Sequence, residues 1–450
     1  MHRELPKEFL SSIQNKLGKE ADRFIKSMYE DPTISIRKNL SKPTHLSEEE
    51  IVPWAPHAHY LKDRPNFTLD PLFHAGAYYV QEASSMFLYH VLKSLIPEPD
   101  QNLKILDLCA SPGGKTTTIL DYLEGNGLLV SNEVIQSRIF PLIDNVIKWG
   151  YDNVVVTNND GATFGKKLRG FFDVIVVDAP CSGEGMFRKS ENAIRDWNPE
   201  NVELCSSRQR RILGDAISSL NTNGYLIYST CTYNDEENIR NVEWLCNSFG
   251  LESIPIDSPK EWGIEAITLN GVSGYQFYPH KLKGEGYFIS VLKSNQERDV
   301  GKLVQHSNLK VLDKNQHKVL EQWIDDSSNC YATTKGEVYK YNDSVSQHIH
   351  HLLQHTKVRY SGVKLGQVNK KIFIPNHALA LENKGVYIGN SVLLDNDDAL
   401  RYLRKDLSKI DTSPKGWLKV THQNMGIGWL KNLGNRINNY LPKELRIKNL

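Results

Sequence analysis

Hydrophobic and polar positions alternate in blocks between residues 75 and 293, and these blocks predict strands separated by helices. Short, mainly apolar runs such as KILDL (104–108) and VIVV (174–177) predict buried strands. Longer segments with apolar residues every three or four positions, such as 201–220, predict the intervening helices. Strands that alternate with helices indicate a doubly wound α/β fold with a mainly parallel sheet.

The segments before this region follow other patterns. Residues 5–30 have apolar residues at helical spacing and predict two short helices that meet near Gly18. Residues 33–39 predict a short strand. The proline-bearing stretch 51–73 predicts an extended connector.

The segments after residue 293 differ again. A polar stretch predicts a linker, residues 310–356 are of mixed character with a helix at 315–325, and short strands with glycine turns dominate from 357. We therefore expect four parts, with bounds 1–73, 74–295, 296–356 and 357–450.

Composition restricts the class of protein. The chain has 450 residues, of which 40% are hydrophobic and 24% charged, and it contains neither a run of membrane-spanning length nor a signal-peptide-like N-terminus. We expect a cytoplasmic protein without a membrane segment. The six cysteines form no C-x-x-C pair, so we expect neither a metal site nor a disulfide framework.

The net charge of +1 conceals an asymmetry along the chain. Residues 1–295 hold 30 Lys and Arg against 38 Asp and Glu, a balance of −8, whereas residues 296–450 hold 24 against 15, a balance of +9. A basic C-terminal part attached to a mildly acidic one is typical of a protein with a polyanionic partner such as nucleic acid. On charge alone, a lysine-rich solvated surface is an equally good interpretation.

The segment CASPGGKTTT (109–118) follows a predicted strand and resembles a phosphate-binding loop. A Walker A motif, however, needs a glycine where this chain has Cys109, and Pro112 removes a backbone donor. A P-loop ATPase is therefore disfavoured, and the G-x-G-x-x-G dinucleotide fingerprint is absent. What remains is a tight turn in which Gly113 and Gly114 let a ligand approach the backbone.

Acidic residues at the following strand ends indicate which ligand this turn binds. Glu133 ends the next strand, where its carboxylate can accept hydrogen bonds from two ribose hydroxyls. Asp160 follows the strand after that and could accept a hydrogen bond from an adenine amino group. An adenosine ligand without a required pyrophosphate suggests S-adenosylmethionine. We expect Lys115 to reach toward Asp178 and the methionine end of that cofactor rather than a phosphate.

Two further strand ends carry cysteines. One strand ends in DAPCSG with Asp178 and Cys181, and the next ends in STCT with Cys231, so both thiols should face one cleft. A lone buried cysteine is usually structural, but a pair at this position favours chemistry. The other four cysteines have no such company and are interpreted as structural.

A methyltransferase needs a thiol when its target is the weakly nucleophilic carbon 5 of cytosine. A thiolate that adds to carbon 6 turns carbon 5 into an enamine carbon able to attack the sulfonium methyl group. A base then removes the carbon 5 proton and the thiol is eliminated. An acid near N3 would assist, and Asp178 is placed for that role.

These motifs resemble the Sun/nucleolar-protein family of RNA cytosine-5 methyltransferases. The likeness rests on DLCASPGGK (107–115), DAPCSG (178–183) and STCT (229–232), and it extends over nearly the whole chain, most closely to the family's RsmF-type enzymes of 16S ribosomal RNA. It implies a Rossmann-like methyltransferase core, a small N-terminal α+β module that contributes to RNA binding, and a C-terminal PUA-like RNA-binding domain.

The resemblance also implies roles for individual residues. Cys231 corresponds to the family's nucleophile, and Cys181 to the cysteine that assists proton removal and product release. The residues expected to bind S-adenosylmethionine are Cys109, Ala110, Ser111, Pro112, Gly113, Gly114, Lys115, Glu133, Asp160 and Asp178.

The expected partner is RNA, most simply 16S ribosomal RNA or the small ribosomal subunit, and the expected state is a monomer. Because the target cytosine must reach two thiols within a cleft, a flipped or single-stranded base is implied. Phe187, Arg188 and Lys189 are candidates to stack on or grip the RNA, although packing or solvation explains them equally well. A transfer RNA substrate and a non-catalytic RNA-binding protein of ribosome assembly remain as alternatives.

Overall fold

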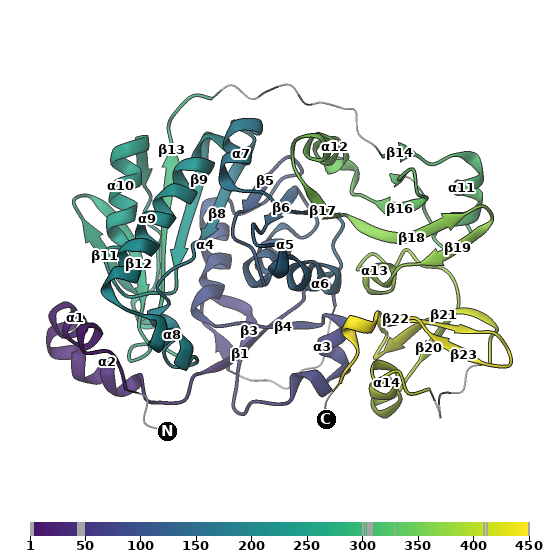
Figure 1. The fold of residues 1–450 in the computed structure, drawn as a ribbon, viewed down its shortest axis with the longest axis horizontal. Helices are drawn as coiled ribbons and strands as arrows, with labels where there is room; N and C mark the ends of the chain where they lie inside the picture. The colour runs from purple at the N-terminus through teal and green to yellow at the C-terminus, as the bar shows by residue number, and fades with distance from the viewer. Residues whose placement is uncertain are drawn as a thin grey trace.

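The structure is a computed structural model, and a ten-stranded mixed sheet lies at the centre of its described residues (Figure 1). The described residues are 4–42, 50–298, 301, 303, 309–327, 329–407, 410 and 413–448.

The parallel core of this sheet has the order β7-β6-β5-β8-β9. These strands are β5 (Lys104–Asp107), β6 (Leu128–Asn132), β7 (Val154–Thr157), β8 (Phe172–Asp178) and β9 (Leu220–Thr230). The strands beyond β9 pair antiparallel: β10 (Leu251–Ser253), β11 (Glu265–Leu269), β12 (Val272–Phe277) and β13 (Tyr287–Ser294). The doubly wound, mainly parallel sheet predicted from the alternating pattern is confirmed.

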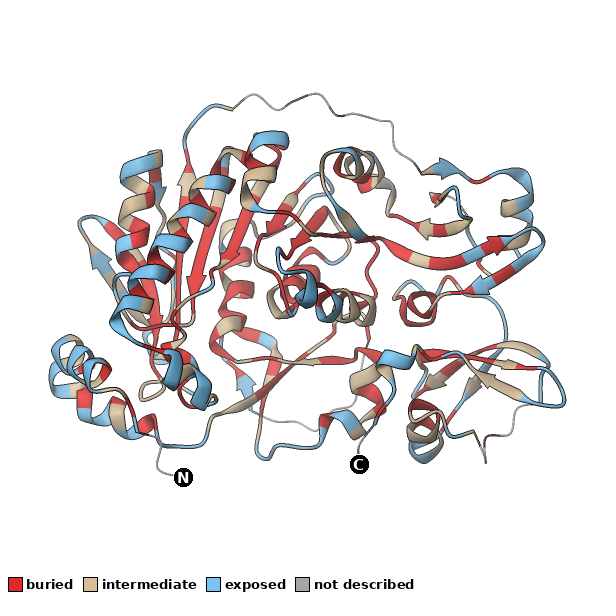
Figure 2. Ribbon diagram, viewed as in Figure 1, coloured by how far each residue is buried: buried red, intermediate tan, exposed pale blue. Residues whose placement is uncertain are grey.

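Helices cover both faces of the sheet, and its central strands β5 to β8 are mostly buried, whereas β11 at one end is partly exposed (Figure 2). Successive residues of β5 point to opposite faces, so Ile105 joins one hydrophobic cluster and Leu106 the other. The first cluster contains side chains of α4 (Phe87–Leu95), α5 (Gly114–Leu123) and α6 (Ile139–Trp149). The second contains side chains of α7 (Gly161–Lys167), α9 (Pro199–Ala216), α10 (Ile239–Phe249) and α12 (Ser346–His355).

The N-terminal residues form the two predicted helices, α1 (Lys7–Leu17) and α2 (Ala21–Ser27), joined by a 3₁₀ turn that begins at Gly18. Their apolar faces are buried, and Phe9 and Phe24 both contact Tyr233 of the central domain. The pattern of apolar positions therefore marks the surface by which this helix pair docks.

The expected extended connector at 51–73 is wrong, because most of this stretch has regular structure. It contains β2 (Ile51–Val52), β3 (Ala55–Leu61) and α3 (Pro71–Ala75). With β1 (Ile34–Lys38) and β4 (Tyr78–Val80) the two strands form a sheet of order β2-β3-β1-β4. Prolines at 53 and 56 are tolerated because this short sheet is irregular there, with a register shift between Ile51 and Val52.

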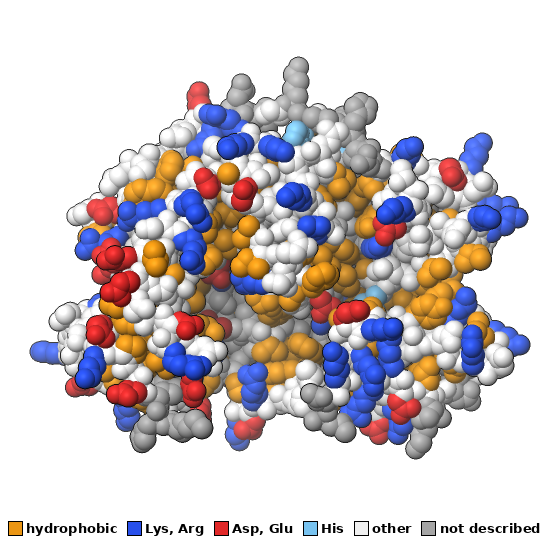
Figure 3. Space-filling model, in the orientation of Figure 1, with side chains coloured by type: hydrophobic (Ala, Val, Ile, Leu, Met, Phe, Trp, Pro, Cys, Tyr) orange, Lys and Arg blue, Asp and Glu red, His pale blue; other side chains and the backbone are white. Residues whose placement is uncertain are grey.

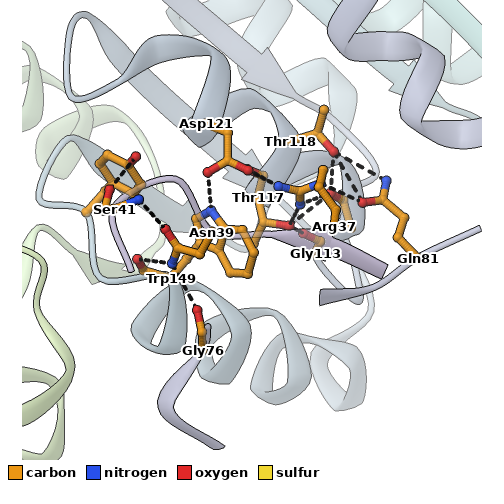
Figure 4. A network of polar contacts seen from close by, with 12 residues as sticks. Arg37, Asn39, Ser41, Gly76, Gln81, Gly113, Thr117, Thr118, Asp121 and Trp149 are labelled. Atoms are coloured by element: carbon orange, nitrogen blue, oxygen red, sulfur yellow. Dashed lines mark hydrogen bonds and ion pairs between the residues drawn. The ribbon is translucent and has the colours of Figure 1, made fainter. Parts of the chain in front are cut away.

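A buried ion pair fastens this small sheet to the central domain (Figure 4). The Arg37 guanidinium of β1 pairs with Asp121 of α5, and both side chains are only 2% exposed. Arg37 also donates to Gln81 (2.9 Å) and to the hydroxyl of Thr117 (2.5 Å), and its guanidinium lies 4.7 Å from the ring of Trp149. The N-terminal sheet is thus fixed against the helix that begins at residue 114.

The C-terminal third contributes two smaller sheets. The first has the order β14-β15-β16-β18-β19 and takes strands from both sides of residue 357. Its strands are β14 (Lys310–Val311), β15 (Cys330–Ala332), β16 (Glu337–Lys340), β18 (Val363–Asn369) and β19 (Ile372–Pro375), accompanied by α11 (Lys314–Leu320) and α13 (His377–Leu381). In the chain, β17 (Val358–Ser361) lies between β16 and β18, but it belongs to the central sheet, where it pairs with β7.

The second sheet packs against the N-terminal module. It consists of β20 (Ser391–Leu393), β21 (Gly416–His422), β22 (Met425–Asn432) and β23 (Ile437–Asn439), and α14 (Asn396–Leu403) lies beside it. Leu418 and Leu430 share a hydrophobic cluster with Leu72 and Tyr78. The N-terminal module around α3 and β4 and the last sheet therefore share one hydrophobic core.

Candidate active site

The loop between β5 and α5 is the first part of the site. Gly113 has φ of +117°, a conformation that side-chain-bearing residues rarely adopt, and α5 begins immediately after it. The Asn145 amide donates to the carbonyl of Pro112 (2.9 Å), and the Arg138 guanidinium donates to the carbonyl of Ser111 (2.7 Å). Side chains from outside the loop thus hold its backbone in place.

The remaining loop residues line the same turn. The backbone N–H of Ala110 donates to the carbonyl of Asn132 at the end of β6 (2.9 Å). Cys109 is half-buried, and burial raises the pKa of its thiol above the ordinary value. This thiol therefore stays protonated, as expected for a structural cysteine.

Asp107, the last residue of β5, is an acidic group that sequence reasoning did not single out. Its side chain is fully buried, and Thr116 donates to Oδ2 (2.7 Å) while Oδ1 has no hydrogen-bond partner among the described residues. Burial raises the pKa of Asp107 to about 7, against the opposing hydrogen bond from Thr116. An acidic residue within the apolar run that precedes the glycine turn is the signal that could have identified it.

Glu133 and Asp160 occupy different environments. The Glu133 side chain is 5% exposed; Oε1 accepts from the N–H of Ile135 (2.8 Å) and Oε2 lies 3.6 Å from Arg138. Asp160 is exposed and caps α7, with Oδ1 accepting from both the N–H and the hydroxyl of Thr163. These hydrogen bonds lower the pKa of Asp160, so its carboxylate stays ionised.

These groups suit an adenosyl ligand. The buried Glu133 carboxylate keeps acceptor sites beyond the one used by Ile135, because each ionised carboxylate offers about four. Asp107, at the neighbouring strand end, adds an oxygen without a hydrogen-bond partner in the part of the chain that the structure describes. The turn at Gly113 leaves the backbone open to close approach. Acceptors for hydroxyl and amino groups, beside a loop without a phosphate nest, fit a nucleoside carrying a positively charged group.

Lys115 forms an ion pair with Asp178, as predicted. Its ammonium group lies 2.8 Å from Oδ2 of Asp178, while the hydroxyl of Ser229 donates to Oδ1 (2.9 Å). Burial alone would lower the pKa of Lys115, but the Asp178 carboxylate outweighs that effect and holds the pKa above its ordinary value. The ammonium also lies 5.0 Å from the ring centroid of Tyr287, a residue of β13 that sequence reasoning missed.

Cys181 and Cys231 lie side by side at the ends of adjacent strands. Their sulfur atoms are 3.1 Å apart, and the backbone N–H of Cys231 donates to the sulfur of Cys181 (3.3 Å). The hydrogen bond with Cys231 and burial together raise the pKa of the Cys181 thiol well above its ordinary value. The arrangement brings together the two thiols that the motifs placed 50 residues apart.

Two buried glutamates hold the turns that carry these thiols. Glu184 accepts hydrogen bonds from the backbone N–H groups of Tyr233 (2.8 Å) and Asn234 (3.0 Å) and from the hydroxyl of Thr232 (2.6 Å). Glu237 accepts from the N–H of Ser182 (2.9 Å). Each turn is thus fixed by a carboxylate from the other, a relation that local sequence patterns do not reveal.

The expected RNA contacts after Cys181 are partly wrong. Phe187 is fully buried between Phe9 and Trp197, so its ring cannot stack on RNA. Arg188 is also buried and pairs with Glu285 (3.5 Å). The two short N-terminal helices cover this segment, which explains why residues next to an active-site turn are packed. Lys189 is exposed, although its ammonium also lies 3.5 Å from Glu285.

The lower ends of β8 and β9 open into a hollow. Figure 1 shows both strands pointing downward in the view, and Figure 3 shows the displayed face hollowed near the place where they end. Within the described ranges no cluster of three or more His, Cys, Asp or Glu side chains could hold a metal ion. No helix there is both long and apolar enough to cross a bilayer.

Family comparisons match three successive parts of the chain. Residues 93–293 match the family described as 16S rRNA methyltransferase RsmB/F. Residues 5–83 match the N-terminal domain of 16S rRNA methyltransferase RsmF, and residues 390–447 match the RsmF PUA domain. The predicted three-part arrangement of core, N-terminal module and PUA-like domain is confirmed.

Curated relatives match over almost their whole length. The chain is 31% identical to ribosomal RNA small subunit methyltransferase F of Aliivibrio salmonicida, over 98% of this chain and 97% of that protein. It is 30% identical to the protein of the same name from Shewanella loihica, over 98% of this chain and 95% of that one.

Solved structures show the same fold in the central region. A methyltransferase homologue from Pyrococcus horikoshii matches with a TM-score of 0.55 and 24% identity, over 64% of this chain and 95% of that one. NSun6 from the same organism, determined with SFG, matches with a TM-score of 0.53 and 20% identity, over 65% and 99%. The fold is that of S-adenosylmethionine-dependent methyltransferases, as predicted.

Proposed function

We propose, since this chain belongs to the ribosomal RNA small subunit methyltransferase F family, that it methylates carbon 5 of a cytosine in 16S ribosomal RNA. The observation that carries the proposal is the pair of thiols 3.1 Å apart at the ends of β8 and β9. Methyl transfer to an amino or hydroxyl group needs no cysteine, whereas transfer to carbon 5 needs a nucleophile that adds to carbon 6. The intact pair also argues against a non-catalytic RNA-binding protein.

The environment of the thiols supports Cys231 as the nucleophile. Because the pKa of Cys181 is raised, Cys181 retains its proton and can donate a hydrogen bond to the sulfur of Cys231. The sulfur of Cys231 therefore has a hydrogen-bond donor beside it, and a cysteine nucleophile reacts as the thiolate. The thiolate adds to carbon 6 of the cytosine, and the electron pair of the carbon 5–carbon 6 double bond makes carbon 5 an enamine carbon. Carbon 5 can then bond the sulfonium methyl group, whose sulfur would leave as a neutral thioether.

Asp178 and Lys115 support the ring during this addition. Asp178 lies on the same sheet edge as the thiols, where its carboxyl group can contact the pyrimidine near N3. Lys115 holds that carboxyl in place through the 2.8 Å ion pair. S-adenosylmethionine, when bound by the loop 109–115 with Glu133 and Asp160, supplies the methyl group. Asp107, buried at the end of β5 before this loop, is a further candidate contact.

Release of the product reverses the addition. A base in the cleft takes the proton from carbon 5, the double bond reforms, and the bond between Cys231 and carbon 6 breaks. Cys181 assists because its S–H can again donate to the departing thiolate, 3.1 Å away. Without this donor the elimination is slower and the covalent adduct lasts longer.

The chain also has the means to hold a large anionic substrate. The basic residues 296–450, with a balance of +9, include the part that matches the PUA domain. Lys and Arg contacts to phosphates position the RNA without reading its sequence. The target cytosine then leaves its stack to enter the cleft.

Bisulfite sequencing tests the proposal. Ribosomal and transfer RNA are taken from a strain that lacks this protein and from the same strain supplied with wild-type protein or with Cys231→Ala. We expect one or more cytosines of 16S ribosomal RNA to resist conversion only when the wild type is present. Protection confined to transfer RNA would reassign the substrate, and protection by Cys231→Ala would contradict the covalent mechanism.

A further inference from the structure

A second cavity lies beside the cofactor loop, outside the thiol site. It has a volume of about 590 Å³ and lies between α6, β4 and the segment 64–68. Three aromatic residues that line it, Phe67, Phe73 and Tyr79, come from separate elements of the N-terminal module. An aromatic-lined cavity of this size offers π-faces on which a nucleobase can stack.

Cations stand at the same cavity. The Arg64 guanidinium lies 5.6 Å from the Phe67 ring centroid, is exposed, and forms no ion pair with the described residues. Lys148 also lines the cavity, but its charge is paired with Asp144 (2.7 Å). Arg64 is therefore the cation left available for an anionic partner, and its planar group can also stack on a base.

The cavity wall is continuous with the cofactor loop. Asn145 lines the cavity and donates to the carbonyl of Pro112 (2.9 Å). Tyr79 lines it too, and a Cβ atom placed on Gly114 would lie 3.6 Å from the Tyr79 ring. A ligand in this cavity would thus sit directly behind the loop assigned to S-adenosylmethionine.

A neighbouring cavity of about 450 Å³ shares Arg64 and Val80 with the first. Its wall also contains Glu82, Arg188 and Lys189. The last two residues follow the Cys181 turn in the chain, and both pair with Glu285 (3.5 Å each). Arg64 therefore stands between the aromatic cavity and a cavity of mixed charge beside the segment that follows Cys181.

We propose that the aromatic cavity binds one unstacked base of the substrate RNA, close to the flipped cytosine. The Arg64 guanidinium stacks on this base or on the base next to it. This inference rests on the proposed function and specifies how the RNA strand leaves the cleft. The exposed Arg64 guanidinium, which has no ion pair among the described residues, favours a polyanion over an apolar peptide or lipid. Stacking accepts any base, so the cavity positions the strand without selecting sequence.

Binding of a defined RNA tests the proposal. The probe is a fluorescein-labelled decamer of uridines with one central cytosine, compared with a series in which each uridine in turn is replaced by an abasic residue. For the wild-type full chain, we expect one position near the cytosine at which base removal weakens binding roughly tenfold. In Arg64→Ala that positional loss should disappear, because the guanidinium that would hold the base against the aromatic wall is gone.

Lys62→Ala is the matched control. Lys62 is exposed in the same loop, carries the same charge and lines neither cavity. It should weaken all the RNAs equally and keep the positional loss. Failure to bind the decamer, absence of a positional loss, or its retention in Arg64→Ala would overturn the proposal. Methylation of 16S ribosomal RNA detected by bisulfite sequencing would still stand in those cases, so the two failures can be distinguished.

Discussion

The cofactor half and the thiol half of the carboxyl edge of the central sheet are built in opposite ways. In the cofactor half, Asp107 is buried with one oxygen unpartnered among the described residues, and the glycine turn leaves its backbone open. In the thiol half, Glu184 accepts hydrogen bonds from three donors of the segment 232–234 that follows Cys231. The Asp107 carboxyl group thus keeps an unused acceptor, whereas both oxygens of Glu184 are used.

This difference matches the proposed roles of the two halves, cofactor binding in one and nucleophilic attack in the other. A loop that binds and releases a small molecule needs groups whose hydrogen bonds are completed by the ligand. A nucleophile that must meet carbon 6 at bonding distance needs a fixed position, because small displacements slow the reaction strongly. Preorganisation is therefore concentrated at Cys181 and Cys231.

The largest effect is expected from Glu184→Gln. All the groups that contact this carboxylate are donors, including the indole N–H of Trp197 (3.1 Å), so an amide N–H₂ would face another donor. We expect kcat to fall roughly a hundredfold through displacement of Cys231 and the free energy of unfolding to fall by about 2 kcal/mol. Methyl-transfer kinetics and urea unfolding measure the two effects.

The matched control is Glu236→Gln, in the same segment. Glu236 is exposed, and among the described residues its carboxylate forms an ion pair only with Arg240, four positions on (3.0 Å). Its substitution should change kcat and stability little, since exposed pairs contribute at most about 0.5 kcal/mol. Affinity for S-adenosylmethionine should stay unchanged in both variants. Equal kcat in wild type and Glu184→Gln would show that the carboxylate does not position the thiol.

A smaller effect, on stability rather than turnover, is expected from Asp107→Asn. The folded-state pKa of Asp107, about 7, lies above the unfolded value, so the folded state binds the proton more tightly. Wild-type protein without added cofactor should therefore lose about 2–3 kcal/mol of unfolding free energy from this group between pH 5 and pH 8. Asp107→Asn should lack that loss.

Urea unfolding at several pH values measures this difference. The quantity of interest is the free energy of wild type minus that of Asp107→Asn, which cancels the contributions of other titrating groups. A difference that does not change between pH 5 and pH 8 would show that Asp107 is solvated. It would then remove the contrast between the cofactor half and the thiol half of the sheet edge.

Local pattern was enough to predict the parts that one strand or loop determines. The buried strands follow from their apolar runs. The ion pair of Lys115 with Asp178 and the convergence of Cys181 with Cys231 follow from their positions at or just after strand ends, since parallel strands end at one edge. The two N-terminal helices likewise follow from apolar spacing.

Long-range contacts account for what the sequence did not reveal. Phe187 was a candidate to stack on RNA, but Phe9, far away in the chain, covers it. Strand β17 belongs by sequence position to the C-terminal part, yet it pairs with β7. The buried pair of Arg37 and Asp121 likewise joins residues 84 positions apart. None of these pairings has a local signature.

The most direct test of the central claim is a search for a covalent RNA adduct on Cys181→Ala. The full-length variant is incubated with S-adenosylmethionine and a 16S ribosomal RNA transcript, and the mixture is separated on a denaturing gel. Loss of the Cys181 hydrogen bond should slow release, so a slowly migrating protein–RNA band should accumulate and should be absent from the variant that also carries Cys231→Ala. No band with Cys181→Ala, or a band that persists without Cys231, would contradict the account.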